Sequence, residues 1–241
     1  MSVEITMPVY NEEVELEEHI MKLYEYCKVN LKTYQWHITI ADNASTDHTP
    51  RIAEGLSKKY AEIDLLRLNQ KGRGRAVKTA WLNSKADICC YMDIDLSTDL
   101  RHVPELIRAI EQGADIAIGS RLLSKSRVAG RTMVREFISR TLNIFITLLF
   151  QTKISDVQCG FKAVSRRVVI ELLPHIEDNE WFLDSELLIV GQKSGYTIVE
   201  IPVIWRDSPG STVRVIPTIL GDLHGMLRIL ARRPWQAIKS S

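Results

Sequence analysis

The stretch Ile88-Cys-Cys-Tyr-Met-Asp93-Ile-Asp95 decides the fold that this chain is expected to adopt. Its first five residues are apolar or aromatic without alternation, as is typical of a parallel strand buried on both faces. Asp93 and Asp95 follow at once, at the strand end where open α/β sheets bind ligands. Two acids there are costly unless water, a cation or a donor meets them, so the pair is a candidate site for a divalent metal that holds a polyphosphate. A solvated turn with aspartate as a cap is the alternative.

Strand and helix signals alternate on both sides of this stretch. Strands are expected at residues 3–7, 36–41, 63–68, 87–92 and 115–118, with Pro8 ending the first, and helices at 12–29, 49–60, 74–84 and 103–111. Such alternation predicts right-handed βαβ units, and therefore an α/β fold whose mostly parallel central sheet is flanked by helices. No repeat or Gly/Ser linker interrupts the 241 residues, so we expect one domain.

The charge of the chain is balanced overall but uneven along its length. Its 31 basic and 30 acidic residues nearly cancel, so no nucleic-acid partner is expected. Residues 121–140, in contrast, carry six Lys or Arg against one acid, Glu136, which makes a local anion-attracting patch. The four cysteines lack the paired spacing of metal sites and are expected to be reduced thiols of a cytoplasmic protein.

Two amphipathic segments raise the question of membrane contact. Residues 138–150 are apolar but interrupted by polar side chains, and fall short of the ~20 residues that cross a bilayer. Because the first strand follows Met1 closely, we expect no cleavable leader. Residues 137–150 and 216–231 are expected to form amphipathic helices, either as peripheral anchors at a membrane surface or as core or homo-oligomer contacts.

Polar residues collect where successive predicted strands end. They are Pro8, Tyr10, Asn11 and Glu12 after the first strand, Asp42, Asn43, Ser45, Thr46 and Asp47 after the second, and Asn69, Lys71, Gly72, Arg73 and Gly74 after the third. Each cluster alone is also typical of helix caps and turns. Together, on one edge of a sheet, they predict a nucleotide site with carboxylates and amides for base and ribose, lysine for phosphate and acids for a metal.

The Gly72-Arg73-Gly74 segment does not indicate a dinucleotide-binding fold. That fingerprint follows the first strand, whereas this segment follows the third and has Val77 in place of the last glycine. The glycines are expected to let Lys71 and Arg73 approach a diphosphate closely.

In this order the motifs resemble the inverting family 2 glycosyltransferases with the GT-A fold. The closer resemblance is to the polyprenyl-phosphate (dolichyl-phosphate) mannose and glucose synthases. The residues that carry it are Pro8-Val-Tyr-Asn-Glu12, Asp42-Asn-Ala-Ser45, Lys71-Gly-Arg-Gly74, Asp93-Ile-Asp95, Gly119-Ser-Arg121, Asp156-Val-Gln-Cys-Gly-Phe-Lys162, Trp181-Phe-Leu-Asp184-Ser-Glu186 and Pro202-Val-Ile-Trp-Arg206, with Gly210-Ser211.

The resemblance implies roles for particular residues. Arg121, Arg135 and Ser139 would grip the phosphate of the lipid acceptor, and Arg206 and Arg214 would share that task. The donor would be a nucleoside-diphosphate sugar of the UDP-glucose or GDP-mannose type, bound with Mg²⁺ or Mn²⁺. Asp95 would be the main metal ligand and Asp93 the second contact. Ser97 replaces a glutamine common in the mannose synthases, and Asn43-Ala44 replaces Asp-Gly, which leaves Asp42 as the candidate for the base contact.

The reaction implied is transfer of a hexose with inversion to a polyprenyl phosphate at the cytoplasmic face of a membrane. A phosphate monoester, with a second pKa of roughly 6, needs positioning rather than deprotonation. A first alternative is a hydroxyl acceptor with Asp184 or Glu186 as general base, although two such acids are also typical of a helix start. A second is a non-catalytic module that binds sugar nucleotides.

The expected organisation within the single domain follows from these roles. Residues 1–120 would form the donor half, residues 121–215 the acceptor half and residues 216–241 a C-terminal amphipathic helix.

Overall fold

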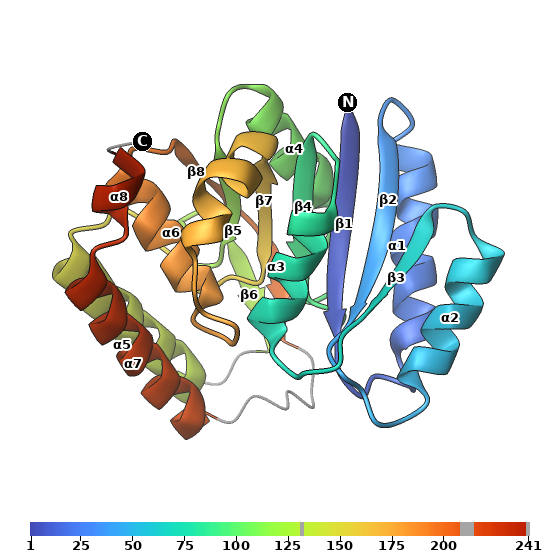
Figure 1. Cartoon of the computed structure of the whole chain (residues 1–241), viewed down its shortest axis with the longest axis horizontal. Coiled ribbons are helices and arrows are strands. Elements are labelled where there is room, and N and C mark those ends of the chain that lie inside the picture. Colours follow the sequence, from blue (N-terminus) through green and yellow to red (C-terminus); the bar gives the residue numbers. More distant parts are fainter. Residues whose placement is uncertain (131–132, 208–214, 240–241) are drawn as a thin grey trace.

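The computed structural model describes residues 1–130, 133–207 and 215–239 of the chain. A seven-stranded sheet with the order β3-β2-β1-β4-β7-β5-β8 runs through the molecule, and helices cover both of its faces (Figure 1). The strands are β1 (Ser2–Val9), β2 (Gln35–Asp42), β3 (Ile63–Arg67), β4 (Ile88–Met92), β5 (Ile116–Ser120), β7 (Phe161–Ser165) and β8 (Ile198–Pro202). Only β7 is antiparallel to its neighbours β4 and β5 in this sheet, so the predicted mostly parallel sheet is confirmed.

The remaining elements surround this sheet. A small second sheet pairs β6 (Arg127–Ala129) with β9 (Ile204–Arg206). The α-helices are α1 (Leu16–Asn30), α2 (Thr49–Lys59), α3 (Arg73–Asn83), α4 (Val103–Glu111), α5 (Met133–Phe150), α6 (Leu183–Ser194), α7 (Val215–Arg232) and α8 (Trp235–Lys239). Short turns of other helix types are η1 (Leu100–His102), η2 (Val168–Leu172) and η3 (Leu173–His175).

Two boundaries near the first strand end differ from those expected. β1 continues through Pro8 to Val9, because β4 pairs with β1 only as far as Thr6 and no neighbour on that side requires the missing N–H of proline. α1 begins at Leu16 rather than at residue 12. Asn11 adopts a left-handed φ of 55°, and the turn that follows starts with Glu12, whose carbonyl accepts from the Leu16 N–H.

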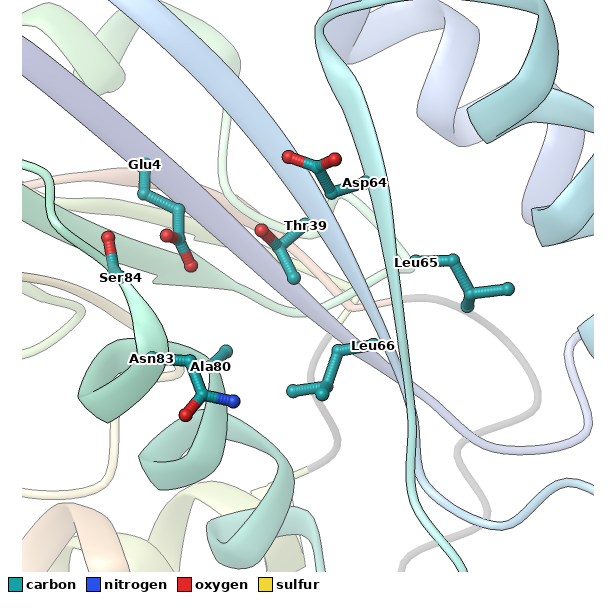
Figure 2. A pocket seen from close by; sticks show the side chains of 8 residues that line it. All are labelled: Glu4, Thr39, Asp64, Leu65, Leu66, Ala80, Asn83 and Ser84. Atoms are coloured by element: carbon teal, nitrogen blue, oxygen red, sulfur yellow. The ribbon is translucent and has the colours of Figure 1, made fainter.

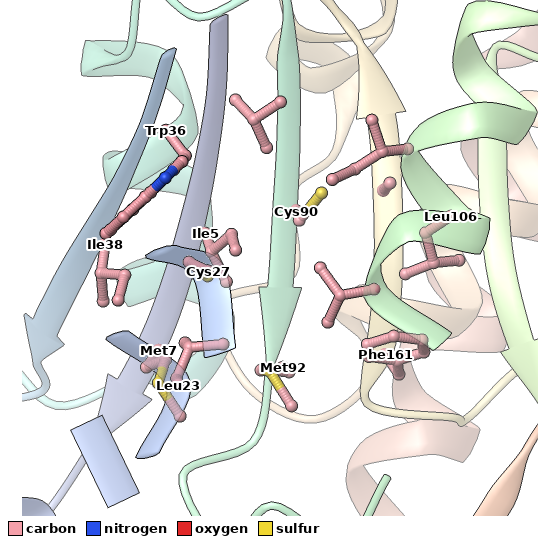
Figure 3. Close-up of a cluster of buried hydrophobic side chains, with 14 of the residues drawn as sticks. Ile5, Met7, Leu23, Cys27, Trp36, Ile38, Cys90, Met92, Leu106 and Phe161 are labelled. Atoms are coloured by element: carbon pink, nitrogen blue, oxygen red, sulfur yellow. The ribbon is translucent and has the colours of Figure 1, made fainter. Parts of the chain in front are cut away.

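The sheet separates two hydrophobic clusters. Cys90 and Met92 of β4 point into the cluster under α1 and α4, shown in Figure 3, whereas Cys89 and Tyr91 point into the other cluster. The unbroken apolar run of this strand is therefore explained by burial on both faces. All four cysteines are free and buried, and burial raises the pKa of the Cys27 thiol to about 12.

α5 and α7 lie at the same end of the molecule (Figure 1) and pack on one cluster, with Ile146 from α5 and Met226 and Ile229 from α7. Both helices also expose apolar side chains, namely Met133, Phe137, Ile144, Phe145, Leu148, Leu149, Leu220, Leu223 and Leu227. Each helix therefore contributes to the core with one face and is apolar on another. None of the helices in the described part of the chain has the length and hydropathy that crossing a bilayer requires.

Two glycines of α7 differ in how closely they lie to the residue that precedes α6. A Cβ atom at Gly225 would overlap the ring of Phe182, whereas one at Gly221 would meet nothing within 4 Å. We expect Gly225→Ala to lower the free energy of unfolding by about 1–3 kcal/mol through overpacking. Gly221→Ala, on the same helix, should raise it by about 0.5–1 kcal/mol because alanine favours helix. Denaturant melts of both variants check this, and equal effects would contradict the docking.

α7 also buries Asp222, whose Oδ2 accepts from Gln158 Nε2 at 3.0 Å. Its Oδ1 has no hydrogen-bond partner. Burial, together with the charges of Asp178 and Asp184, raises the pKa of Asp222 to about 7. The folded state therefore keeps this carboxyl group protonated at pH values where the unfolded chain has it ionised.

This preference makes stability depend on pH. A raised carboxyl pKa in the folded state means that its contribution is fully present below about pH 4 and is lost as pH rises through about 7. A difference of about three pKa units corresponds to a loss of at most ~4 kcal/mol. Asp222→Asn should flatten the fall in unfolding free energy between pH 4 and 7, measured by denaturant melts at each pH. A slope identical to that of the unaltered chain would contradict the assignment.

Candidate functional site

The polar clusters after β1 and β2 meet at the carboxyl edge of the sheet, where Val9 lies opposite Asp42. Asn11 joins them, because its backbone N–H donates to Ser45 Oγ at 3.0 Å and its Oδ1 accepts from the Thr46 N–H at 2.8 Å. The left-handed φ of Asn11 is one that asparagine tolerates better than most residues. The structure thus brings the first two predicted clusters into one rigid unit.

Glu12 is held at the same edge by its backbone N–H, which donates to Thr49 Oγ1 at 2.7 Å. Burial, followed by the charges of Glu15, Asp95 and Asp47, raises the pKa of Glu12 to about 7. The charge of Asp95 contributes to this shift, which is consistent with the first and fourth predicted clusters lying at the same edge of the sheet.

Asp42 is fully buried at the end of β2. Its Oδ1 accepts from the Ser45 N–H at 3.0 Å, and Oδ2 accepts no hydrogen bond, with Arg67 Nε 3.7 Å away. A buried carboxylate oxygen without a donor is costly, and a ligand group that donates to it would relieve that cost. This environment suits the contact with the nucleotide base that the resemblance implies for Asp42.

The third cluster packs against the loop of residues 179–180, a contact that the sequence does not predict. The Gly72 N–H donates to Asn43 Oδ1 at 2.5 Å. A Cβ atom at Gly72 would lie 2.6 Å from the carbonyl oxygen of Asn179, and one at Gly74 would lie 2.7 Å from that of Glu180. In this structure the two glycines therefore permit the approach of the 179–180 loop. Lys71 extends elsewhere, with Nζ 3.4 Å from the centre of the Tyr10 ring.

Arg73 lies at the centre of a chain of four charges, three of them buried and one, Asp93, half-buried. Its Nη2 donates to Asp93 Oδ1 at 2.6 Å and its Nη1 to Asp184 Oδ2 at 3.0 Å. The Nζ of Lys162, whose side chain is 0% exposed, is 2.8 Å from Asp184 Oδ1, which also accepts a hydrogen bond from the Tyr91 hydroxyl. We call Asp93, Arg73, Asp184 and Lys162 the charge chain.

The charge chain sets the protonation of its members. Burial acts to raise the pKa of Asp184, but the charges of Lys162 and Arg73 outweigh it and hold that pKa below its usual value. At Asp93 burial prevails over Arg73, so the pKa of this carboxyl is raised. Burial alone would lower the pKa of Arg73, yet the surrounding acids keep it well above its usual value. Lys162 belongs to a quoted motif, but its role was not recognised from the sequence.

Asp95 has neutral partners instead. Ser97 donates to it twice, from its backbone N–H at 3.0 Å to Oδ1 and from its hydroxyl at 2.6 Å to Oδ2. The serine that stands where the resemblance leads us to expect glutamine therefore orients Asp95.

The residues at this edge fit a metal that arrives with its ligand. In the described part of the chain, no three His, Cys, Asp or Glu side chains gather into a metal-binding group. Asp93 and Asp95 offer two hard oxygen ligands, and Mg²⁺ is commonly bound by one or two carboxylates together with phosphate oxygens and water.

Arg121, predicted to bind the acceptor phosphate, is paired with an acid. Its Nε is 2.7 Å from Asp156 Oδ2, its Nη2 is 2.9 Å from Asp156 Oδ1, and its guanidinium lies 5.0 Å from the centre of the Trp205 ring. Burial acts to lower the pKa of Arg121, but Asp156 raises it overall. Asp156 lies in one of the motifs that carry the resemblance, but no role was predicted for it from the sequence. In the structure it fixes the orientation of Arg121.

The other predicted acceptor residues are distributed around α5 and β9. Ser139 is buried on α5, and Arg206 is exposed at the end of β9, where its N–H donates to the Ser97 carbonyl at 2.8 Å. Arg135 is in the first turn of α5, but its side chain lies outside the described part of the structure, as do all of Arg214, Gly210 and Ser211. β9 thus lies next to the Asp95 loop.

Glu186, the second acid proposed as a base, is 1% exposed and fully engaged. Its Oε1 accepts from the Glu177 N–H at 3.3 Å, and its Oε2 from the Asp178 N–H at 2.7 Å and from Arg228 Nη2 at 2.6 Å. Burial raises its pKa. Glu186 therefore anchors the loop before α6 to α7.

The loop of residues 176–180 is held from both sides. Arg232 of α7 reaches Glu177 at 2.5 Å, and Lys78 Nζ of α3 donates to the carbonyls of Ile176 and Glu177 at 3.0 and 3.1 Å. Since Asn179 contacts Gly72, this loop connects α7 with the Gly72–Gly74 turn. No local sequence signal indicates these contacts, because they join segments far apart in the chain.

A separate cavity lies away from this edge, between β1, β2, β3 and α3 (Figure 2). Glu4 and Thr39 line it with Asp64 and Ser84, and Glu4 lies opposite His37 and Cys89, toward the beginnings of the strands. It contains none of the predicted site residues.

Comparisons with known proteins identify the family. Residues 4–173 match the profile described as glycosyl transferase family 2. The glycosyltransferase AglD of Haloferax volcanii is 34% identical, over 95% of this chain and 37% of its own length. A dolichyl-phosphate beta-glucosyltransferase of Dictyostelium discoideum is 32% identical, over 95% of this chain and 73% of its own length. These relatives confirm the resemblance stated from the motifs.

Solved structures show the same fold. Glucosyl-3-phosphoglycerate synthase from Mycobacterium tuberculosis in complex with UDP superposes with a TM-score of 0.70 at 18% identity, covering 94% of this chain and 79% of that one. The same enzyme is also known in complex with Mn²⁺ and UDP-glucose. The likeness confirms the predicted GT-A fold class. On the family profile and the Dictyostelium relative, this chain belongs to glycosyl transferase family 2.

Proposed function

We propose that this chain transfers a hexose, with inversion and with a divalent metal, from a nucleoside-diphosphate sugar to a polyprenyl phosphate. The donor is of the UDP-glucose or GDP-mannose type, and glucose is favoured by the name of the Dictyostelium relative. The product is a β-linked polyprenyl-phosphate sugar. The known complex of the Mycobacterium tuberculosis enzyme with Mn²⁺ and UDP-glucose supports the choice of metal and donor class.

The state of the two candidate bases carries this proposal. Asp184 is paired with Lys162 and Arg73, and these charges lower its pKa, so it is a poor proton acceptor. Both oxygens of Glu186 accept hydrogen bonds from protein donors. A hydroxyl acceptor needs a base, whereas a phosphate acceptor is already anionic at neutral pH. The contacts of these acids therefore favour a phosphate acceptor.

The donor would lie along the carboxyl edge of the sheet. Asp42 accepts from the base, Lys71 and Arg73 face the diphosphate, and Asp95 and Asp93 hold Mg²⁺ or Mn²⁺. When bound, the metal supplies positive charge for the leaving nucleoside diphosphate. Ser97 keeps Asp95 in a fixed orientation for this task.

The acceptor phosphate would approach from the side of α5 and β9. Arg121 is held in place by Asp156 and Trp205, and Arg135, Ser139, Arg206 and Arg214 complete the assigned set. The four arginines and the Ser139 hydroxyl position the phosphate oxygen for attack on the anomeric carbon, opposite the leaving diphosphate.

The exposed apolar residues of α5 and α7 support peripheral contact with a membrane that holds the lipid acceptor. Phe137, Phe145, Leu148, Leu220 and Leu227 are side chains of the kind that enter the headgroup region from an interfacial helix. We place this contact at the cytoplasmic face.

A direct assay separates the possible acceptors. The purified chain is incubated with Mn²⁺ and radiolabelled UDP-glucose or GDP-mannose, with a short polyprenyl phosphate or with the matching polyprenol. We expect an organic-soluble product only with the phosphate lipid, because that acceptor needs no base. Product with the polyprenol would sink the proposal, and donor binding without transfer or hydrolysis would favour a non-catalytic module.

The Ser97 hydroxyl offers a test of the metal assignment. Ser97→Ala removes one charge-assisted hydrogen bond to Asp95, worth about 1.5–3 kcal/mol, and leaves the backbone donor. The Mn²⁺ concentration for half-maximal activity should rise about tenfold or more, with a smaller change at saturating metal. Ser57→Ala, which removes an exposed hydroxyl bonded to the Glu54 carbonyl, is the control. An unchanged metal requirement in Ser97→Ala would argue against Asp95 as a ligand.

A further inference from the structure

The guanidinium of Arg73 lies among two aromatic rings and two carboxylates. Its centre lies 5.2 Å from the centre of the Tyr91 ring and 4.7 Å from that of the Trp181 ring. The side chain is only 8% exposed. The backbone of α3 that carries it is fixed by the contact of Gly74 with the Glu180 carbonyl. Arg73 is therefore a positive charge that is largely, but not completely, shielded from solvent.

Of the two acids that pair with Arg73, Asp93 accepts more of its hydrogen bonds. Both Nε and Nη2 of Arg73 donate to Oδ1 of Asp93, at 3.2 and 2.6 Å. On the other side, Gly160 packs so closely that a Cβ atom there would overlap Asp93 Oδ2 and lie 3.0 Å from Arg73 Nη2. One oxygen of Asp93 is therefore paired with a cation, and the other lies close to the backbone of Gly160.

Asp95 differs in this respect, although it is only two residues away. It accepts hydrogen bonds from the N–H and the hydroxyl of Ser97, which are neutral groups. One carboxylate of the pair is neutralised by a cation and the other is oriented without being neutralised. A dication that approaches both meets the full charge of Asp95 but a compensated Asp93.

We propose that Arg73 is a positioning residue that competes with divalent metal for Asp93 until the diphosphate of the donor arrives. The inference rests on the proposed function, in that Asp93 and Asp95 are its metal ligands. Metal alone is repelled by the neighbouring guanidinium. An anionic diphosphate offers the guanidinium an alternative partner, and Asp93 then becomes available to the metal. By linkage, nucleotide and metal each strengthen the binding of the other by the same factor.

A purely structural ion pair predicts a different outcome. Breaking such a buried pair leaves an unpaired charge and weakens everything built on it. Competition predicts instead that removal of the guanidinium increases the affinity for metal in the absence of nucleotide. The sign of the change in metal affinity therefore distinguishes the two roles.

The test measures Mn²⁺ binding to the full chain by the EPR signal of the free ion, with and without UDP. Arg73→Gln removes the cation, and the double variant Arg73→Gln with Asp184→Asn removes one charge of each sign so that the charge chain stays balanced. Since an opposite charge nearby alters a carboxylate's affinity for a proton by one to three pKa units, we expect the double variant to bind Mn²⁺ alone about tenfold more tightly than the unaltered chain. UDP should strengthen Mn²⁺ binding in both proteins, because its phosphate oxygens can bind the metal directly, but by about tenfold more in the unaltered chain than in the double variant.

Two further variants serve as controls. Arg73→Lys keeps the charge and should retain weak binding of Mn²⁺ alone. Arg101→Gln removes an exposed arginine that pairs with Asp99, and should leave both affinities unchanged. Thermal melts of each variant verify that it is folded before titration.

The outcomes separate this inference from the proposed function. If the folded double variant binds Mn²⁺ alone no more tightly than the unaltered chain, while UDP strengthens Mn²⁺ binding in the unaltered chain, competition by Arg73 is overturned and the metal site stands. If the unaltered chain binds no Mn²⁺ even with UDP, the metal assignment fails and the inference fails with it.

Discussion

The alternation of charges Asp93, Arg73, Asp184 and Lys162 is the constraint on which the rest of the site depends. The four residues come from the end of β4, α3, α6 and β7, so the charge chain joins segments that are far apart in the sequence. Three of these ions are buried, and each needs an opposite neighbour, since an unpaired charge in the interior is strongly destabilising. The antiparallel strand β7 has a specific task in this arrangement, because it delivers Lys162 to the centre of an otherwise parallel sheet.

Much of the framework followed from local patterns. The buried run before Asp93, the alternation of strands and helices, and the gathering of Asn11, Asp42 and Asp93 at one edge are consequences of periodicity and of parallel topology. α4 occupies the expected residues, whereas β1 and α1 differ where a proline is tolerated and where Asn11 adopts a left-handed conformation. These differences arise from tertiary pairing that a local pattern does not contain.

The partners of the site residues were not predictable in the same way. Arg73 and Asp184 are 111 positions apart, and Tyr91 and Asp184 are 93 apart, so nothing local links them. The sequence offered Asp184 or Glu186 as a general base, with two acids at a helix start as the alternative. In the structure one is held by cations and the other by backbone donors and Arg228, and these contacts are what favours a phosphate acceptor in the proposed function. Motif membership indicated which residues matter, but only the contacts indicate which of their atoms remain free.

The loop of residues 176–180 has a consequence for how the enzyme is divided. The expected organisation has a donor half, an acceptor half and a C-terminal amphipathic helix within one domain. α7 holds this loop through Arg228 and Arg232, and the same loop packs against Gly72 and Gly74. A chain shortened before α7 would therefore lose the support for one side of the Gly72–Gly74 segment as well as an apolar surface. In this fold one helix both carries exposed apolar side chains and supports that segment, and the two features cannot be exchanged as independent modules.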